Sequence, residues 1–189
     1  MYEGIGAAGS GPGSSEEYTR EWRAFVQEFI SKNTVMTIVD WGCGDWTHSK
    51  LIDWNNAKYF GIDIVPSLIE SLNQQFADEN TSFHLFDPDI ISSRSLISIV
   101  CQNVDVIICK DVIQHLPNDV SIELLKTFID SCKFLILVND IKGNPNVDTH
   151  IGGCRHVDPR LPPISITSDD PEIMLGGGEK AVFVIKGNK

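Results

Sequence analysis

The chain has 189 residues, of which 42% are hydrophobic and 22% charged, a balance that is typical of one globular domain. Lys and Arg number 15 against 26 Asp and Glu, and the resulting net charge of −11 disfavours nucleic acid as a partner. No apolar run approaches the roughly 18 residues that a membrane span requires, so no membrane association is expected.

The first part of the chain is rich in glycine and serine and leads into an amphipathic helix. Taken alone, the loop Ser10-Gly11-Pro12-Gly13-Ser14 is as typical of a flexible tail as of a functional segment. Ser14 and Glu17 have the spacing of a capping box, and apolar residues recur at helical spacing from Tyr18 to Ile30. The pattern therefore predicts a helix that starts at Ser14 and tethers the loop to the protein.

Strand and helix patterns then alternate along the chain. Short β-branched or apolar runs predict five strands, at residues 37–41, 58–64, 82–86, 104–109 and 134–138. Helices are predicted from Pro66 and from Asn118, where apolar residues follow at helical spacing. This order predicts an α/β fold with a mostly parallel sheet, right-handed crossovers and helices on both faces.

The alternation ends after Asp140. Residues 141–170 contain several prolines and few periodic signals, and a segment this long without regular structure is usually functional in a compact domain. The end of the chain returns to a strand pattern. Residues 172–175, the turn at residues 176–178 and residues 181–186 predict an antiparallel hairpin at the edge of the sheet.

Glycines and carboxylates follow the predicted strands at their carboxyl ends, where open α/β sheets bind ligands. The first strand ends in Asp40-x-Gly42-x-Gly44, in which the glycines let the backbone approach a ligand closely. The second strand ends near Asp63, which is well placed for the hydroxyls of a ribose, and the third ends near Asp87. Carboxylates therefore follow three successive strands.

Two cofactor classes place a ribose at such a site. A dinucleotide requires a third glycine where this chain has Trp46 or Thr47, and its pyrophosphate would be repelled by Asp40. S-adenosylmethionine has a sulfonium, an ammonium and a ribose but no phosphate, so it fits the acidic strand ends better.

These strand ends, in this order and together with the stretch Lys110–Leu116, resemble class I S-adenosylmethionine-dependent methyltransferases over about residues 35–140. The resemblance implies a Rossmann-like sheet, with S-adenosylmethionine as cofactor and S-adenosylhomocysteine as product. It places the methionine end of the cofactor at Asp40, the ribose at Asp63 and the adenine amine at Asp87. The residues expected to bind the cofactor are Ser10, Gly11, Gly13, Ser14, Asp40, Gly42, Cys43, Gly44, Trp46, Asp63, Ile64, Asp87 and Lys110.

Two flanking segments are similar to a subfamily of small methyltransferases that accompany glycosyltransferases in bacterial and large-virus glycan pathways. One is the Ser-Gly-x-Gly-Ser loop at residues 10–14; the other is Gly-Gly-Cys-Arg-His-Val-Asp at residues 152–158. The resemblance implies a single methyltransferase domain over residues 1–189, alone or as one domain of a longer chain. It also implies that residues 1–13 form a lid over the cofactor, that residues 141–170 bind the acceptor, and that a glycosyltransferase domain is a partner.

The expected reaction is methylation of a sugar hydroxyl on a glycan or nucleotide-sugar. Because such a hydroxyl is a weak acid, a base or a metal should help to remove its proton. The candidate bases are Asp111, His115 and Asp140. A Mg²⁺ ion held by Asp111, Asn139 and Asp140 is the alternative.

The long loop contains the candidate acceptor contacts His150, Arg155 and His156, although the same residues suit a solvated surface loop or, with Cys154, a zinc site. Trp46 is a candidate for stacking on adenine or on a sugar. Two other functions stay open, namely methylation of another small molecule and a non-catalytic module that binds the cofactor or a partner. The five cysteines form no Cys-x-x-Cys pair, which is typical of a reduced, cytoplasmic protein.

Overall fold

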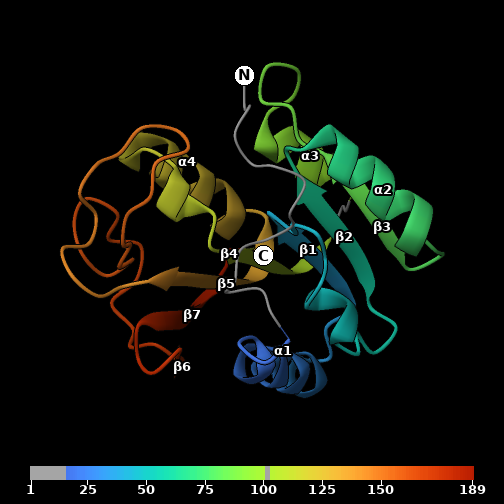
Figure 1. Cartoon of the computed structure of the whole chain (residues 1–189), viewed down its shortest axis with the longest axis horizontal. Helices are drawn as coiled ribbons and strands as arrows, with labels where there is room; N and C mark the ends of the chain where they lie inside the picture. The colour runs from blue at the N-terminus through green and yellow to red at the C-terminus, as the bar shows by residue number, and fades with distance from the viewer. Residues whose placement is uncertain (1–15, 101–102) are drawn as a thin grey trace.

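A computed structural model describes residues 16–100 and 103–189 and shows a twisted sheet of seven strands between helices (Figure 1). The strand order is β3-β2-β1-β4-β5-β7-β6. The elements are α1 (Arg20–Asn33), β1 (Thr37–Trp41), η2 (Ser49–Leu51), β2 (Lys58–Asp63), α2 (Pro66–Phe76), β3 (Thr81–Leu85), α3 (Ser93–Val100), β4 (Val104–Lys110), η3 (Ile113–His115), α4 (Asn118–Ile129), β5 (Cys132–Asp140), β6 (Ile173–Leu175) and β7 (Lys180–Lys186).

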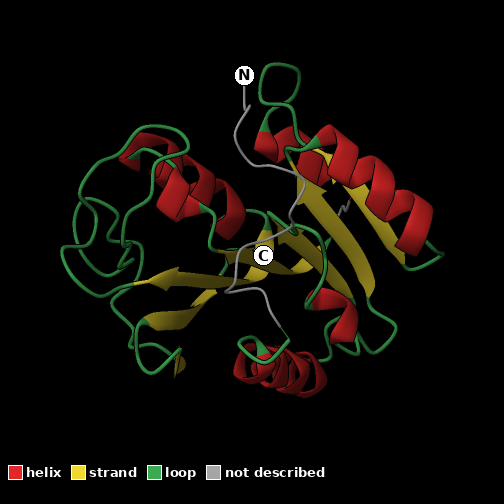
Figure 2. Cartoon of the chain, in the orientation of Figure 1, coloured by secondary structure: helices red, strands yellow, loops and turns green. Residues whose placement is uncertain are grey.

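The strands pair as the sequence predicts. The first five strands are parallel to one another and β7 is antiparallel to β5. At the edge of the sheet, β6 is the first strand of a hairpin and pairs antiparallel with β7 (Figure 2). Parallel pairing brings the carboxyl ends of β1 to β5 to one edge of the sheet. The predicted α/β fold, a mostly parallel sheet with a C-terminal antiparallel hairpin, is confirmed.

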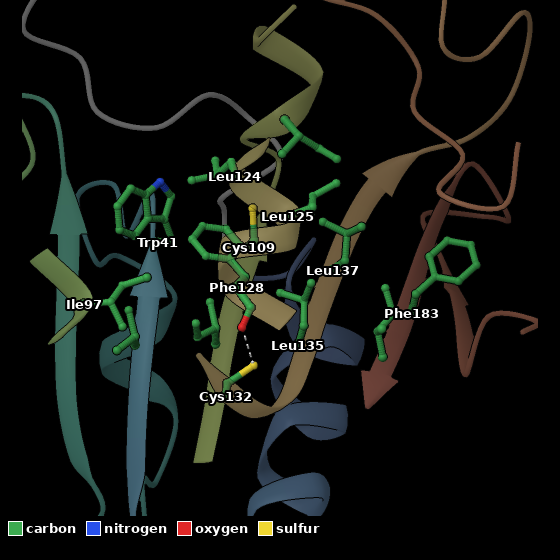
Figure 3. Packing of buried hydrophobic residues seen from close by; sticks show 14 of the residues in the cluster. Trp41, Ile97, Cys109, Leu124, Leu125, Phe128, Cys132, Leu135, Leu137 and Phe183 are labelled. Atoms are coloured by element: carbon green, nitrogen blue, oxygen red, sulfur yellow. Dashed lines mark hydrogen bonds between the residues drawn. The ribbon is translucent and has the colours of Figure 1, made fainter. Parts of the chain in front are cut away.

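Apolar side chains form one core on each face of the sheet, because successive residues of a strand point to opposite faces. Residues of α1 and α2 pack on one face, with Trp22 and Leu72 buried there. Residues of α3 and α4 pack on the other face, where Phe128 meets Trp41 (Figure 3). Helices therefore cover both faces, and α1 and α4 lie on opposite sides of the sheet in Figure 1.

Two helices differ from the prediction. Helix α1 begins at Arg20 rather than at Ser14, because residues 16–19 form a turn and no side chain caps the helix. Helix α3 was not predicted, since its eight residues bury only Leu96 and Ile97 and thus give too short a periodic signal. No helix among the described residues is long and apolar enough to span a membrane. Ser10, Gly11, Gly13 and Ser14 lie outside the described residues.

Candidate active site

A glycine turn follows β1 at the carboxyl edge of the sheet. Gly42 and Gly44 have φ angles of +79° and +56°, which L side chains rarely adopt. The amide of Gly42 donates to the carbonyl of Ile62 over 2.8 Å, which ties the turn to β2. A Cβ at Gly42 would collide with the side chain of Val112 after β4, so this close approach also requires glycine.

Asp63, at the end of β2, holds the glycine turn through its carboxylate. Its Oδ2 accepts from the amide of Gly44 at 3.1 Å, and its Oδ1 accepts from the amides of Ile64 and Val65 at 2.8 and 3.2 Å. The side chain is half-buried, so these bonds fix its orientation at the edge of the sheet. Carboxylate oxygens accept several hydrogen bonds, and the arrangement suits the two hydroxyls of a ribose.

The end of β3 lies beside Asp63. The amide of Phe86 donates to the main-chain carbonyl of Asp63 over 2.8 Å, which places Asp87 one residue beyond this contact. The Asp87 carboxylate accepts from the amide of Asp89 at 3.0 Å, so it is held in a local turn. Ile64, which follows Asp63, is half exposed. The structure therefore brings Gly44, Asp63 and Asp87 together in the predicted order along the sheet.

Asp40 lies beneath the glycine turn and is only 5% exposed. Burial raises the pKa of its carboxyl from 3.8 to about 6, although a 2.5 Å hydrogen bond from the Tyr59 hydroxyl and the charge of Lys110 act in the opposite direction. A buried carboxylate with this pKa is largely ionised at neutral pH and supplies negative charge under the turn. This charge favours a cationic ligand.

Replacing Asp40 with asparagine is expected to stabilise the fold at neutral pH. The pKa of Asp40 in the folded state lies above its ordinary value of 3.8, so the contribution of Asp40 to the free energy of unfolding is most favourable below about pH 4. That contribution is lost as the pH rises through 6, and the free energy of unfolding falls by about 3 kcal/mol in all. Asparagine can still accept from Tyr59 but carries no charge to desolvate. Urea unfolding at pH 4.5 and 7.5 measures the free energy of unfolding. The increase caused by Asp40→Asn should be small at pH 4.5 and large at pH 7.5.

The matched control for this experiment is Asp78→Asn. The exposed Asp78 carboxylate accepts from the amides of Asn80 and Thr81, and these bonds lower its pKa. Its replacement should therefore change stability with the opposite sign at neutral pH. A gain for Asp40→Asn that is the same at both pH values would contradict the assigned cause.

Two predicted cofactor residues have side chains in the core. Trp46 is buried, and its ring centroid lies 5.1, 5.2 and 5.6 Å from those of Phe76, Phe83 and Tyr59. Cys43 is buried as well, and burial raises the pKa of its thiol. This placement corrects the expectation that the Trp46 ring stacks on adenine or a sugar, because that ring already fills the space between α2 and the sheet.

A charged cluster joins the ends of β4, β5 and β7. The ammonium of Lys110 donates to Asp111 Oδ2 at 2.6 Å, Lys180 donates to Asp111 Oδ1, and Lys180 lies 3.7 Å from Asp140. The two lysine side chains are 12% and 15% exposed. Burial alone would raise the pKa of Asp111, but the two lysines outweigh it and the net shift is downward. Asp111 is therefore a weak base with both oxygens engaged.

Lys180 is a site residue that the sequence analysis missed. It lies opposite Asp140 in the antiparallel pairing of β5 and β7. The sequence does contain a signal for this role. Lys180 comes directly before the second predicted strand of the hairpin, and the start of an antiparallel strand lies opposite the end of the strand with which it pairs. Without the register of that pairing, the partner residue stays unknown.

The structure does not assemble the alternative Mg²⁺ site. Asn139 and Asp140 are successive residues of β5, so their side chains point to opposite faces of the sheet. Ammonium groups already occupy the oxygens of Asp111. Over residues 16–100 and 103–189, no three His, Cys, Asp or Glu side chains are grouped as metal ligands. For the same reason, the structure does not assemble the alternative zinc site of His150, Cys154 and His156 in the long loop.

The long loop is fixed against η3 and the start of α4. Arg155 is only 8% exposed and donates to the carbonyl of Leu116 at 2.8 Å and to the hydroxyl of Ser121 at 3.1 Å. This corrects the expectation that Arg155 contacts an acceptor, because its guanidinium is buried under the loop. His150 and His156 are exposed on the loop surface, and His115 is exposed beside it.

Comparisons with known proteins agree with this geometry. A family model described as a methyltransferase domain matches residues 15–144. The N-terminal domain of EvdMO1 with bound SAH has a TM-score of 0.63 and 12% identity, over 88% of this chain and 81% of its own. A second EvdMO1 structure, in the presence of SAH and D-fucose, has a TM-score of 0.59 and 12% identity, over 88% and 82% of the two chains.

A third solved structure is the magnesium protoporphyrin IX methyltransferase ChlM from Synechocystis PCC 6803 with bound SAH. Its TM-score is 0.51 and its identity 18%, over 67% of this chain and 58% of ChlM, so this chain spans little more than half the length of that relative. The comparison with curated protein sequences gives no match. At these identities the solved structures establish a shared fold.

Proposed function

Because the chain belongs to the methyltransferase domain family, we propose that it transfers a methyl group from S-adenosylmethionine to a sugar hydroxyl. The observation that best supports this cofactor is the hydrogen bond from the Gly44 amide to Asp63 Oδ2. It joins the glycine turn to the carboxylate that is proposed to bind the ribose. Solved structures that share the fold contain SAH. In this arrangement Asp63 accepts from the ribose hydroxyls and Asp87 accepts from the adenine amine.

The methionine end of the cofactor is proposed to lie over the glycine turn. Asp40 supplies the negative charge beneath it, and Lys110 and Lys180 offer ammonium groups for the methionine carboxylate. A small pocket beside these two lysines is lined by Tyr18, Thr19, Trp22, Lys110, Leu175 and Lys180. We propose that residues 1–13, which lie outside the described residues, close over this end as a lid.

His115 is the proposed base. The acceptor oxygen attacks the methyl carbon, the bond from that carbon to sulfur breaks, and S-adenosylhomocysteine leaves. The hydroxyl proton passes to an imidazole nitrogen of His115, while positioning of the two reactants supplies much of the rate. Asp111 is a poorer base because two lysines hold its pKa low.

The sugar acceptor rests on two supports. Residues 10–14 and 152–158 resemble methyltransferases of glycan pathways, and EvdMO1, which shares the fold, was solved in the presence of D-fucose. By the same resemblance, a glycosyltransferase is the proposed partner. Labelled S-adenosylmethionine should transfer its methyl group to members of a panel of sugars, nucleotide-sugars and glycans. Transfer only to porphyrins, phenols or peptides in a parallel panel would overturn the sugar assignment.

Methyl transfer is expected to be independent of divalent metal. The carboxylate that a Mg²⁺ ion would need, Asp111, is already neutralised by two ammonium groups. Rates measured after treatment with EDTA, and again after addition of excess Mg²⁺, should agree within experimental error. A loss of activity with EDTA that Mg²⁺ restores would show that the cluster rearranges to bind a metal.

A further inference from the structure

The imidazole of His115 is held in one tautomer by the main chain of the long loop. Its Nδ1 lies 2.7 Å from the carbonyl oxygen of Gly153. A carbonyl oxygen only accepts, so Nδ1 carries the proton and Nε2 keeps its lone pair. The side-chain amide of Gln114 lies 3.4 Å from Nε2, a long contact in which the amide is the donor. Both contacts agree on the tautomer that leaves Nε2 able to take a proton.

Backbone pairing fixes the Gly153 carbonyl in front of His115. The amide of Gly152 donates to the carbonyl of His115 over 2.8 Å, and the amide of Arg155 donates to the carbonyl of Gln114 over 3.1 Å. Gly153 lies between these two bonds. A Cβ at Gly153 would collide with the Thr149 hydroxyl, so the tight turn requires glycine.

Arg155 anchors this pairing from the buried side. Its guanidinium donates to the carbonyl of Leu116, to Ser121 and to the side-chain oxygen of Asn118. These acceptors are the residue directly after η3, which ends at His115, and two residues at the start of α4. Burial lowers the pKa of Arg155, and its Nε has no hydrogen-bond partner among the described residues. A buried cation beside the N-terminus of a helix lowers stability, so a contribution to stability does not explain why Arg155 lies there.

We propose that Arg155 is a positioning residue that, through the Gly153 carbonyl, holds His115 in the tautomer with the proton on Nδ1. The proposal rests on the proposed function in one respect, namely that Nε2 of His115 accepts the proton from the acceptor. The tautomer itself depends only on the contacts between the loop and η3. Arg155 thus acts through His115 and touches neither cofactor nor acceptor.

The test is the imidazole nitrogen spectrum of the full chain, labelled with ¹⁵N-histidine and recorded above the pH at which imidazole is protonated. The signals of His115 are assigned by their loss in His115→Gln. The wild type should show one protonated nitrogen, Nδ1, and one unprotonated nitrogen, Nε2. In Arg155→Lys, which keeps the charge but not the planar fork, the two signals should move toward each other as both tautomers become populated.

Two further variants make the result decisive. Gly153→Ala displaces the carbonyl without leaving a buried charge unpaired, so it should have the same effect if Arg155→Lys fails to fold. Arg160→Lys alters another arginine of the loop, which pairs with Asp158 and Asp170, and should leave the His115 signals unchanged.

A wild-type spectrum with the proton on Nε2 would overturn the inference. Unchanged His115 signals in folded Arg155→Lys and Gly153→Ala would overturn it as well. The spectra need neither cofactor nor acceptor, so a failure to transfer methyl groups counts against the proposed function and leaves this inference standing.

Discussion

Asp63→Ala is expected to weaken the binding of S-adenosylhomocysteine at least 100-fold. A carboxylate that accepts from both ribose hydroxyls makes two charge-assisted hydrogen bonds, each contributing about 1.5–3 kcal/mol. A loss of about 3 kcal/mol or more corresponds to a factor of over 100 in the dissociation constant. The variant also frees the amides of Gly44, Ile64 and Val65, so the glycine turn keeps only its backbone bonds to Ile62 of β2.

The control for this change is Asp78→Ala. Asp78 likewise accepts from backbone amides, those of Asn80 and Thr81 at 2.8 and 2.7 Å, but it precedes β3 at the opposite end of that strand. Its loss removes comparable bonds and should leave the affinity for S-adenosylhomocysteine within about twofold of wild type. Equal affinities for Asp63→Ala and wild type, in variants that melt cooperatively, would rule out the assigned ribose site.

His115→Ala is expected to slow methyl transfer to a hydroxyl acceptor by about 10²–10⁴-fold, the range for loss of a positioned general base. The affinity for the cofactor should not change, because His115 lies on the loop side of the site and contacts Gly153. The measurements are single-turnover transfer of the labelled methyl group and calorimetric binding of S-adenosylhomocysteine. A rate deficit that shrinks at high pH, where hydroxyl acceptors ionise more readily, would identify the lost step as proton removal.

Asp140→Asn serves as the comparison for His115→Ala. Asp140 lies at the same edge of the sheet, but its ion pair with Lys180 is long, at 3.7 Å. Its replacement should therefore slow transfer by no more than a few fold. If Asp140→Asn abolishes transfer while His115→Ala retains it, Asp140 is the base and the loop has another purpose.

The strands and their ends follow from local sequence patterns. The apolar runs of β4 and β5 are buried on both faces, and this requirement is visible in the residues themselves. Parallel pairing then brings Gly44, Asp63 and Asp87 to one edge whatever the exact loop paths. For this reason the fold, and the edge of the sheet at which these three residues lie, could be predicted without a structure.

Other features depend on contacts between distant segments and could not be predicted. The pairing of Lys180 with Asp111 requires the register of β7 on β5. The burial of Arg155 depends on the path of the loop over α4, since its sequence suits an exposed contact equally well. Trp46 could have pointed to the ligand or to the core. Its ring lies in the core because it packs against Tyr59, Phe76 and Phe83, which come from three other segments.

Binding of the cofactor underlies the roles proposed for Asp40, Asp63 and Asp87. Calorimetric titration of the full chain with S-adenosylhomocysteine measures it without an acceptor. We expect saturable binding of one molecule per chain, with affinity lost in Asp63→Ala and kept in Asp78→Ala. Absence of binding to the folded wild-type chain, for S-adenosylmethionine as well as for S-adenosylhomocysteine, would contradict the assignment of the strand ends and direct the search to NAD.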